Sequence, residues 1–155
     1  MSKFRLLPRA VTTITPQRVG FAGGGTDFPA FYRQHGGAVL SSAIDKYIYV
    51  TVKRHSSLFN ENYRLSYSKT EHVNSLDDIE NDIARECLRL VDVEPPLFIA
   101  TASDLPVSSG LGSSSSFAVG LLYALHTLRG EDVSAGQLAE EACHVELNVL
   151  SLIHI

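Results

Sequence analysis

A run of glycines and serines interrupts the most apolar part of this sequence, and its position limits what the chain can fold into. The run reads DLPVSSGLGSSSS over residues 104–116, between an expected strand at 97–102 and an expected helix at 117–128. That helix is apolar on nearly every face, which is typical of a buried helix. A flexible Gly/Ser linker would join two separable units, whereas this run lies between core elements. We therefore predict a binding loop.

The composition of the run favours a phosphate as its ligand. Glycine lets the backbone approach a ligand closely and adopt a positive φ angle. Free N–H groups at the start of the following helix point at the ligand, and the helix dipole favours negative charge there. Serine hydroxyls add donors and are possible ligands for Mg²⁺. No lysine lies in the run and no GxGxxG pattern is present, so it is neither a Walker loop nor a dinucleotide fingerprint.

Length and charge bound the remaining possibilities. The 155 residues suffice for one domain with a core, and the formal net charge of −4 argues against a nucleic-acid surface. The sequence has no apolar stretch near the roughly 20 residues of a membrane span, and the first residues do not form a signal peptide. We expect a cytoplasmic protein without a nucleic-acid or membrane partner. Cys87 and Cys143 are predicted to be buried free thiols rather than a disulfide.

Strand and helix patterns are interleaved along the chain, which predicts an α+β fold. A bent strand or strand pair is expected at 10–21, and Asp27, Phe28 and Pro29 are expected to open a short helix that ends at Gly36-Gly37. Residues 39–53 are expected to form one long strand or two, with 63–67 as the partner. Ser75 is expected to cap a helix that runs to Val91 with apolar steps of three and four. Ser134 and Gln137 form a capping-box pattern for a last helix that reaches about Leu150.

Two glycine-rich segments resemble motifs of the GHMP kinases, the superfamily of galactokinase, homoserine, mevalonate and phosphomevalonate kinases. The run at 106–116 is similar to their PxxxGLGSSxA-type motif, and RVGFAGGGTD at 18–27 is similar to their first motif. With GGAV at 36–39 and IDKY at 44–47, the chain most resembles the D-glycero-D-manno-heptose 7-phosphate kinases and their fucokinase-like relatives. The resemblance covers residues 9–150. It implies a ribosomal-protein-S5-domain-2-like sandwich that transfers a phosphoryl group from ATP to a sugar hydroxyl.

The resemblance also implies roles for individual residues. Arg18 would lie near the reacting hydroxyl and the transferred phosphoryl group. Ser114 would hold Mg²⁺, with Glu146 as a second metal ligand. The sugar would contact Gly24, Gly25, Thr26 and Asp27. The nucleotide would be bound by Pro106, Ser109, Gly110, Leu111, Gly112, Ser113, Ser114 and Ser115.

Three of these residues have structural alternatives that the sequence leaves open. Arg18 is also compatible with a surface salt bridge, and Asp27 with a helix N-cap. Glu146 has apolar neighbours three and four residues away on a helix, so its carboxylate must be paired, protonated or metal-bound. A metal and a buried salt bridge both meet that requirement. His144 cannot share the face of Glu146, and we expect it to be packed or exposed rather than a ligand.

In the family a further Asp and a carboxyl-terminal domain follow the last helix, and residues 151–155 match neither. We therefore expect residues 1–150 to form the ATP-binding amino-terminal domain, with the catalytic base outside this chain, and the chain as given to be an inactive fragment. A nucleotide-binding module without catalysis is the alternative from another class, and an RNA-binding protein of the same fold is a third. Fucose, galactose or isoprenoid-alcohol kinases remain alternatives within the enzyme class.

Overall fold

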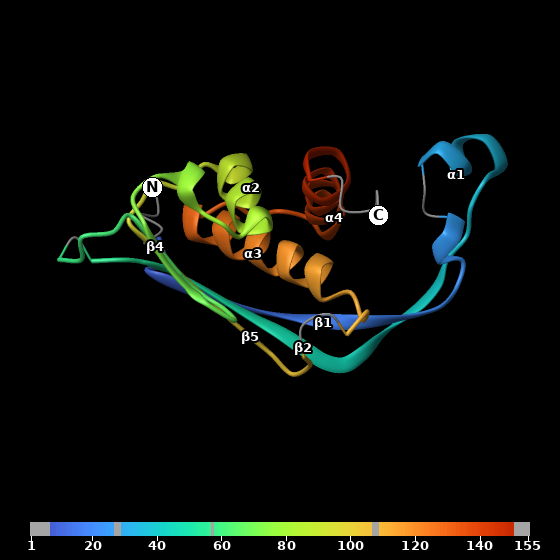
Figure 1. Cartoon of the computed structure of the whole chain (residues 1–155), viewed down its shortest axis with the longest axis horizontal. Helices are drawn as coiled ribbons and strands as arrows, with labels where there is room; N and C mark the ends of the chain where they lie inside the picture. The colour runs from blue at the N-terminus through green and yellow to red at the C-terminus, as the bar shows by residue number, and fades with distance from the viewer. Residues whose placement is uncertain (1–6, 27–28, 57, 107–108, 151–155) are drawn as a thin grey trace, which may run out of the picture.

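A curved five-stranded sheet, with helices packed on one face, forms the body of the molecule (Figure 1). The computed structural model describes residues 7–26, 29–56, 58–106 and 109–150. The strands are β1 (Ala10–Ala22), β2 (Leu40–Arg54), β3 (Tyr63–Ser66), β4 (Thr70–Val73) and β5 (Leu97–Ser103). The helices are α1 (Pro29–His35), α2 (Asp82–Val91), α3 (Ser113–Arg129) and α4 (Ala135–Cys143), with 3₁₀ turns at Gly24–Thr26 and Leu76–Asp78 and a π-helical turn at His144–Val149. The α+β class is confirmed.

The strands lie in the order β1-β2-β5-β3-β4, and all neighbours are antiparallel except β3 and β5. The expected pairing of residues 63–67 with the long strand is therefore wrong. Strand β5 lies between them and pairs with β2 over Ile48–Arg54, while β3 pairs with β4 and β5. The prediction assumed that strands adjacent along the chain pair with each other. It is wrong here because β5, from later in the sequence, lies between β2 and β3 in the sheet.

Helix α3 is the central element of the helical layer and packs against β1, β2, α2 and α4. Leu121, Leu122 and Leu125 are fully buried in the core that it forms with the sheet. Gly120 lets the helix approach β1, because a Cβ atom there would stand 2.7 Å from Thr15 Oγ1. Thr13 Oγ1 donates a hydrogen bond to Gly120 O at 2.9 Å across the same contact. These contacts fix the height of α3 above the sheet and therefore the position of its first turn.

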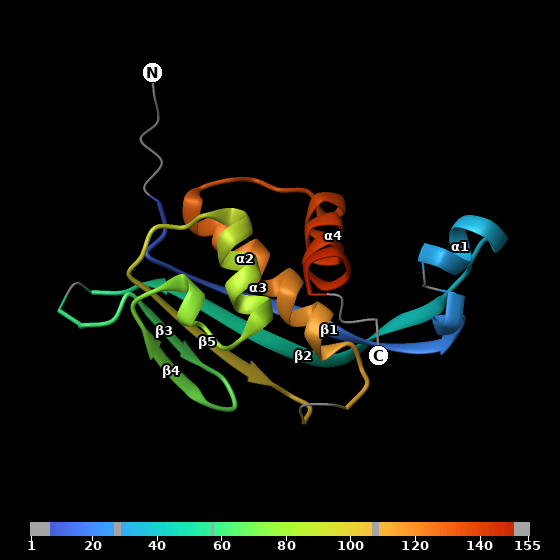
Figure 2. The ribbon, with the colours of Figure 1, turned by 45° about the horizontal axis from the view of Figure 1, so that its top comes forward.

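Strands β1 and β2 continue beyond the sheet as a two-stranded ribbon, and α1 lies at the far end of this ribbon (Figures 1 and 2). The pairing changes register where the ribbon leaves the sheet, since Pro16 faces Tyr47 and Arg18 faces Ala43. Gln17 lies inside this irregularity and is fully buried. The ribbon brings the first glycine-rich segment back toward the helical layer.

The helices differ from the sequence prediction in their boundaries. Ser75 caps only a 3₁₀ turn, and α2 begins after its own cap, Asn81. Leu90, near the end of α2, is exposed. Helix α3 begins at Ser113 rather than at Phe117, so the four serines form its first turn. No described helix is long and apolar enough to cross a bilayer.

The last helical segment follows the prediction more closely. Ser134 caps α4 by accepting from Gln137 N, as expected, but the side chain of Gln137 donates to Glu141 instead of completing the box.

Cys87 is buried as predicted, whereas Cys143 is exposed because it lies on the side of its helix away from the core. Burial, and then the negative charge of Glu146, raise the pKa of the Cys87 thiol well above its ordinary value.

Candidate nucleotide and acceptor site

The first turn of α3 presents backbone amides that no side chain of the helix caps. Gly112 is the N-cap residue, with φ of 76°, and makes no side-chain capping hydrogen bond. The first bond of the helix runs from Ser116 N to Gly112 O at 3.0 Å. The N–H groups of Ser113, Ser114 and Ser115 precede it and have no intrahelical acceptor. An uncapped helix start of this kind suits an anion such as a phosphate.

The glycines before α3 leave space for a ligand. Gly110 has a φ angle of 73°, and beyond its chain neighbours no atom of the described residues lies within 4 Å of the place where its Cβ would stand. The start of the loop is tied to β2, because Asp104 N donates to Tyr47 O at 3.0 Å and Tyr47 N donates to Asp104 Oδ2 at 2.9 Å. Pro106, Ser109 and Leu111 belong to the same turn, while residues 107–108 lie outside the described residues.

The four serines of the turn divide into two pairs with different partners. Ser113 Oγ accepts from Gln17 Nε2 at 3.2 Å, and Ser116 Oγ donates to Pro16 O at 3.0 Å. This pair therefore faces β1. Ser114 Oγ and Ser115 Oγ both donate to the carboxylate of Glu146, at 2.5 and 2.7 Å. The sequence could not separate the two pairs, because helix geometry rather than composition decides which way each hydroxyl points.

Glu146 is half-buried and lies in the π-helical turn that extends α4. Its two oxygens are held by Ser114 and Ser115, so the predicted convergence of Ser114 and Glu146 is present. None of the ion pairs between described residues involves Glu146, and two hydroxyls satisfy the carboxylate in place of a basic partner. A carboxylate and a hydroxyl are oxygen ligands of the kind that Mg²⁺ uses when nucleotide phosphates complete its coordination.

Arg18 is a residue of β1 that lies beside the loop leading into α3. Its backbone N–H donates to Leu111 O at 3.1 Å, and its side chain lies over Gly112, where a Cβ would be 3.0 Å from Arg18 Cγ. The side chain is exposed. The ion pairs found between described residues do not include Arg18, so the surface salt bridge considered from the sequence is not seen in this part of the chain.

The first glycine-rich segment closes into a compact turn around Thr26. Its hydroxyl donates to Gly23 O at 2.8 Å and accepts from Ala38 N at 3.2 Å. Gly23 is required there, because a Cβ would stand 1.9 Å from Ala38 O. Gly24 and Gly25 are exposed and have open space beside them. Asp27 lies outside the described residues, so neither its sugar-binding role nor its N-cap role is tested.

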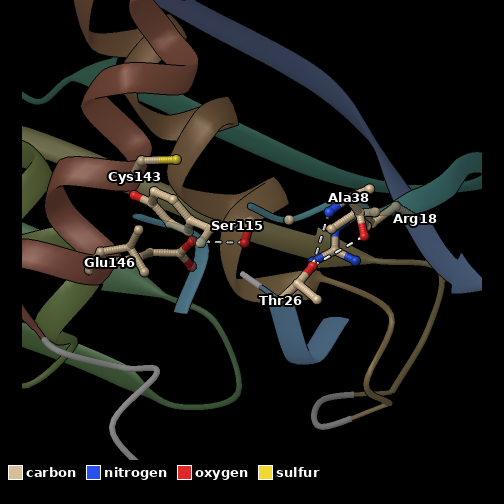
Figure 3. A pocket seen from close by; sticks show the side chains of 10 residues that line it. Arg18, Thr26, Ala38, Ser115, Cys143 and Glu146 are labelled. Carbon is tan, nitrogen blue, oxygen red and sulfur yellow. Dashed lines mark hydrogen bonds between the residues drawn. The ribbon is translucent and has the colours of Figure 1, made fainter. Parts of the chain in front are cut away.

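A cavity of about 540 Å³ joins this turn to the start of α3 (Figure 3). One wall carries Ser115, Cys143 and Glu146, and Arg18, Thr26 and Ala38 lie on the facing side, toward the ribbon (Figure 3). The lining residues are Arg18, Thr26, Tyr32, Gly37, Ala38, Val39, Ser115, Cys143, Glu146 and Leu147. The volume suits a small molecule of sugar size or larger. Gly24 and Gly25 are not among the lining residues.

Several functional candidates in this site were missed from the sequence. Tyr32, Val39, Cys143 and Leu147 line the cavity, but nothing in their local pattern separates them from ordinary helix and strand residues. Gln17 was also missed, although a lone glutamine between threonines and an arginine in a strand was a weak signal. Its partners are nearly one hundred residues away in the sequence, so only the folded chain reveals them.

Known proteins with similar sequences and structures indicate the family to which this site geometry corresponds. Residues 79–154 match the family model described as the GHMP kinases N terminal domain. The D-glycero-alpha-D-manno-heptose 7-phosphate kinase of Campylobacter jejuni is 30% identical over 154 residues, which cover 94% of this chain and 45% of that protein. The mevalonate kinase of Methanothermobacter thermautotrophicus is 33% identical over 110 residues, or 71% of this chain and 36% of that protein.

A solved structure agrees with these relatives. A D-glycero-D-manno-heptose 1-phosphate kinase from Bacteriodes thetaiotaomicron superposes with a TM-score of 0.76 and 25% identity, over 90% of this chain and 49% of that one. The expected sandwich fold is thereby confirmed. The chain spans less than half the length of these relatives.

Proposed function

Because residues 79–154 belong to the GHMP kinase N-terminal domain family, we propose that this chain binds ATP as part of a kinase that phosphorylates a sugar or sugar-phosphate hydroxyl. The observation that carries the proposal is the start of α3. Three amides without intrahelical acceptors, a pair of positive-φ glycines and the exposed Arg18 lie together there, and Arg18 and Ser115 line a cavity of about 540 Å³. Phosphoryl transfer depends mainly on positioning and charge neutralisation, and these groups supply both.

In this proposal the turn Gly110–Ser115 binds the triphosphate through its backbone. The amides of Ser113, Ser114 and Ser115 donate to phosphate oxygens, and Gly110 leaves the space through which they approach. Arg18 places a positive charge beside Gly112, where it neutralises charge on the transferred phosphoryl group. Pro106 and Ser109, in the segment before the turn, are proposed to contact the nucleotide as well.

Mg²⁺ fits the oxygen donors of Ser114 and Glu146. When bound it would neutralise charge on the nucleotide phosphates. In the absence of the ion the two serine hydroxyls donate to Glu146 at 2.5 and 2.7 Å. These hydrogen bonds hold the carboxylate at the mouth of the turn. A bound cation would replace a serine hydroxyl as the partner of one carboxylate oxygen.

The acceptor occupies the cavity between the turn and the ribbon. Two of the relatives are named for heptose phosphates, which favours a heptose phosphate or a similar sugar phosphate as the acceptor. Tyr32 offers an aromatic face and Arg18 a cation on the same cavity. We propose that Thr26, which lines the cavity and closes its turn through its hydroxyl, lies at the sugar end. The sugar contacts predicted for Gly24, Gly25 and Asp27 remain part of the proposal, although Gly24 and Gly25 do not line this cavity.

The test has two steps. Calorimetric titration of the chain with MgATP should show saturable binding, and a coupled assay of ADP release over sugars and sugar phosphates, made with the chain extended to the length of its relatives, should then identify the acceptor. Binding by the chain without any acceptor-dependent ADP release from the extended protein would support a nucleotide-binding module instead. No binding of MgATP, together with salt-dependent binding of RNA, would overturn the proposal.

A further inference from the structure

Gln17 is a fully buried amide that joins three separate segments beneath the phosphate-binding turn. It lies on β1 at the register change between Pro16 and Arg18. Its Nε2 donates to Ser103 Oγ at 3.1 Å, at the end of β5, and to Ser113 Oγ at 3.2 Å, the first residue of α3. The two ends of the loop 104–112 are therefore held to one amide group.

The other end of this amide is not satisfied. Gln17 Oε1 is buried and has no hydrogen-bond partner among the described residues. A buried polar atom without a partner destabilises the folded state. An apolar side chain of the same length would avoid that cost, so the amide is a poor choice for stability alone. Buried polar groups that contradict local stability are expected at functional sites.

The bonds of Gln17 act on the atoms that the proposed function uses. Ser113 is followed directly by Ser114 and Ser115, whose hydroxyls reach Glu146. Ser116 Oγ donates to Pro16 O at 3.0 Å, so the first turn of α3 is anchored to β1 at both of its ends. Arg18, the next residue along β1, lies over Gly112, so the register change between Pro16 and Arg18 brings both side chains to the start of α3.

From these contacts we infer that Gln17 is a positioning residue, which fixes the first turn of α3 against β1 and β5 so that its amides and Arg18 meet one phosphate. This inference rests on the proposed function for its consequence, but the positioning itself is a property of the free chain. Gln17 touches no ligand and is not a catalytic residue. Its effect passes through Ser113 and through the placement of Arg18.

The experiment replaces Gln17 with methionine in the 155-residue chain and reads out three quantities. Gln17→Met keeps the length of the side chain and removes both the hydrogen bonds and the unsatisfied oxygen. We expect a melting temperature equal to or above that of the parent. Amide hydrogen exchange at residues 113–116, read at Ser116 because its N–H is the one of the four with an intrahelical acceptor, should become at least about fivefold faster. The dissociation constant for MgATP should rise about tenfold because preorganisation is lost.

Thr13→Val is the matched control, since Thr13 is also buried on β1 and bonded to α3, but at Gly120. It should leave exchange at 113–116 unchanged. Ser113→Ala removes the other partner of the bond, and should give the same local exchange as Gln17→Met without adding to it in the double variant. This second variant decides the matter if Gln17→Met fails to fold.

Two results would overturn the inference. One is unchanged exchange at 113–116 in both variants, and the other is faster exchange along all of α3 with a lower melting temperature, which describes an ordinary core residue. If the parent chain itself does not bind MgATP, the proposed function fails, while the exchange of the free chain still decides whether Gln17 positions the turn.

Discussion

Arg18 and Gly112 are in direct contact at the entrance of α3: a Cβ atom at residue 112 would lie 3.0 Å from Arg18 Cγ. Gly112 also has a φ angle of 76°, in the left-handed region. Two requirements therefore meet at one residue, the backbone conformation that starts the helix and the room for the arginine stem. The contact connects the first glycine-rich motif to the second.

Replacing Gly112 should separate these two requirements. Gly112→Ala is expected to lose about 1–2 kcal/mol of unfolding free energy to left-handed strain, and to displace Arg18 and weaken MgATP binding further. Gly36→Ala is the matched control, because its φ of 72° imposes the same strain, its Cβ would have no described atom within 4 Å, and Gly36 lies outside the proposed phosphate-binding turn. Thermal unfolding and calorimetric titration measure both variants. Equal losses of nucleotide affinity in the two variants would show that the Arg18 contact is unimportant.

Glu146→Gln should weaken binding of the metal nucleotide selectively. The variant keeps the shape of the side chain but removes its charge, so affinity for MgATP should fall about tenfold, while affinity for ATP in the presence of EDTA should stay within about twofold. Glu140→Gln, an exposed residue of the same helix, controls for net charge. An equal loss with and without Mg²⁺ would place the ion elsewhere.

The contact between α3 and β1 should be intolerant of a single methyl group. Gly120→Ala would push a Cβ to 2.7 Å from Thr15 Oγ1 and 3.2 Å from Thr13 Oγ1. We expect a loss of about 1–3 kcal/mol in unfolding free energy by denaturant titration. Gly136→Ala, where the nearest atom would be Ser134 Oγ at 3.8 Å, should instead be neutral or stabilising by up to about 1 kcal/mol. If both variants unfold alike, α3 is not held as closely to β1 as described.

Stability should depend on the ionisation of Glu61 at acid pH. Burial raises the pKa of this carboxyl, but a backbone hydrogen bond and the charges of His72, Arg64 and His55 outweigh it and hold the pKa below the usual 4.5. A lowered folded pKa contributes stability that is fully present above the unfolded pKa and is lost as the pH falls through the folded pKa.

Glu61→Gln should therefore lower the melting temperature more at about pH 6 than at about pH 3, because the carboxylate that the variant lacks is progressively protonated as the pH falls through the lowered folded pKa. Glu94→Gln, at an exposed position, should show no such difference. A melting-temperature loss that is the same at both pH values would mean that packing, and not charge, is what Glu61 contributes.

Local sequence patterns predicted the parts of this fold that depend on short-range chemistry. The glycine run before α3, the cap at Ser134 and the long strand through Val50 all follow from propensity and periodicity. The sequence predicted a start of α3 at Phe117, which is too late because α3 begins at Ser113. Serines have weak helix propensity, and the tertiary hydrogen bonds of Ser113 and Ser116 to β1 overcome it.

The remaining errors come from contacts between distant segments. The partner of β3 and the exposure of Cys143 depend on where β5 and α4 lie, which no window of the sequence contains. In the site, the family resemblance brought Arg18, Ser114 and Glu146 forward, but the division of the serines and the buried amide of Gln17 needed coordinates. The roles of these residues stay predictions until the variants above are measured.

The ribbon of β1 and β2 supports one wall of the cavity, while α3 and the turn after α4 support the other. Residues 40–43 of the ribbon are exposed and contribute nothing to the buried core. Substitutions along the ribbon can therefore change the width of the cavity without repacking a single core side chain. The two walls of the cavity therefore have different foundations, since the start of α3 is fixed by the core beneath it and the outer part of the ribbon is not.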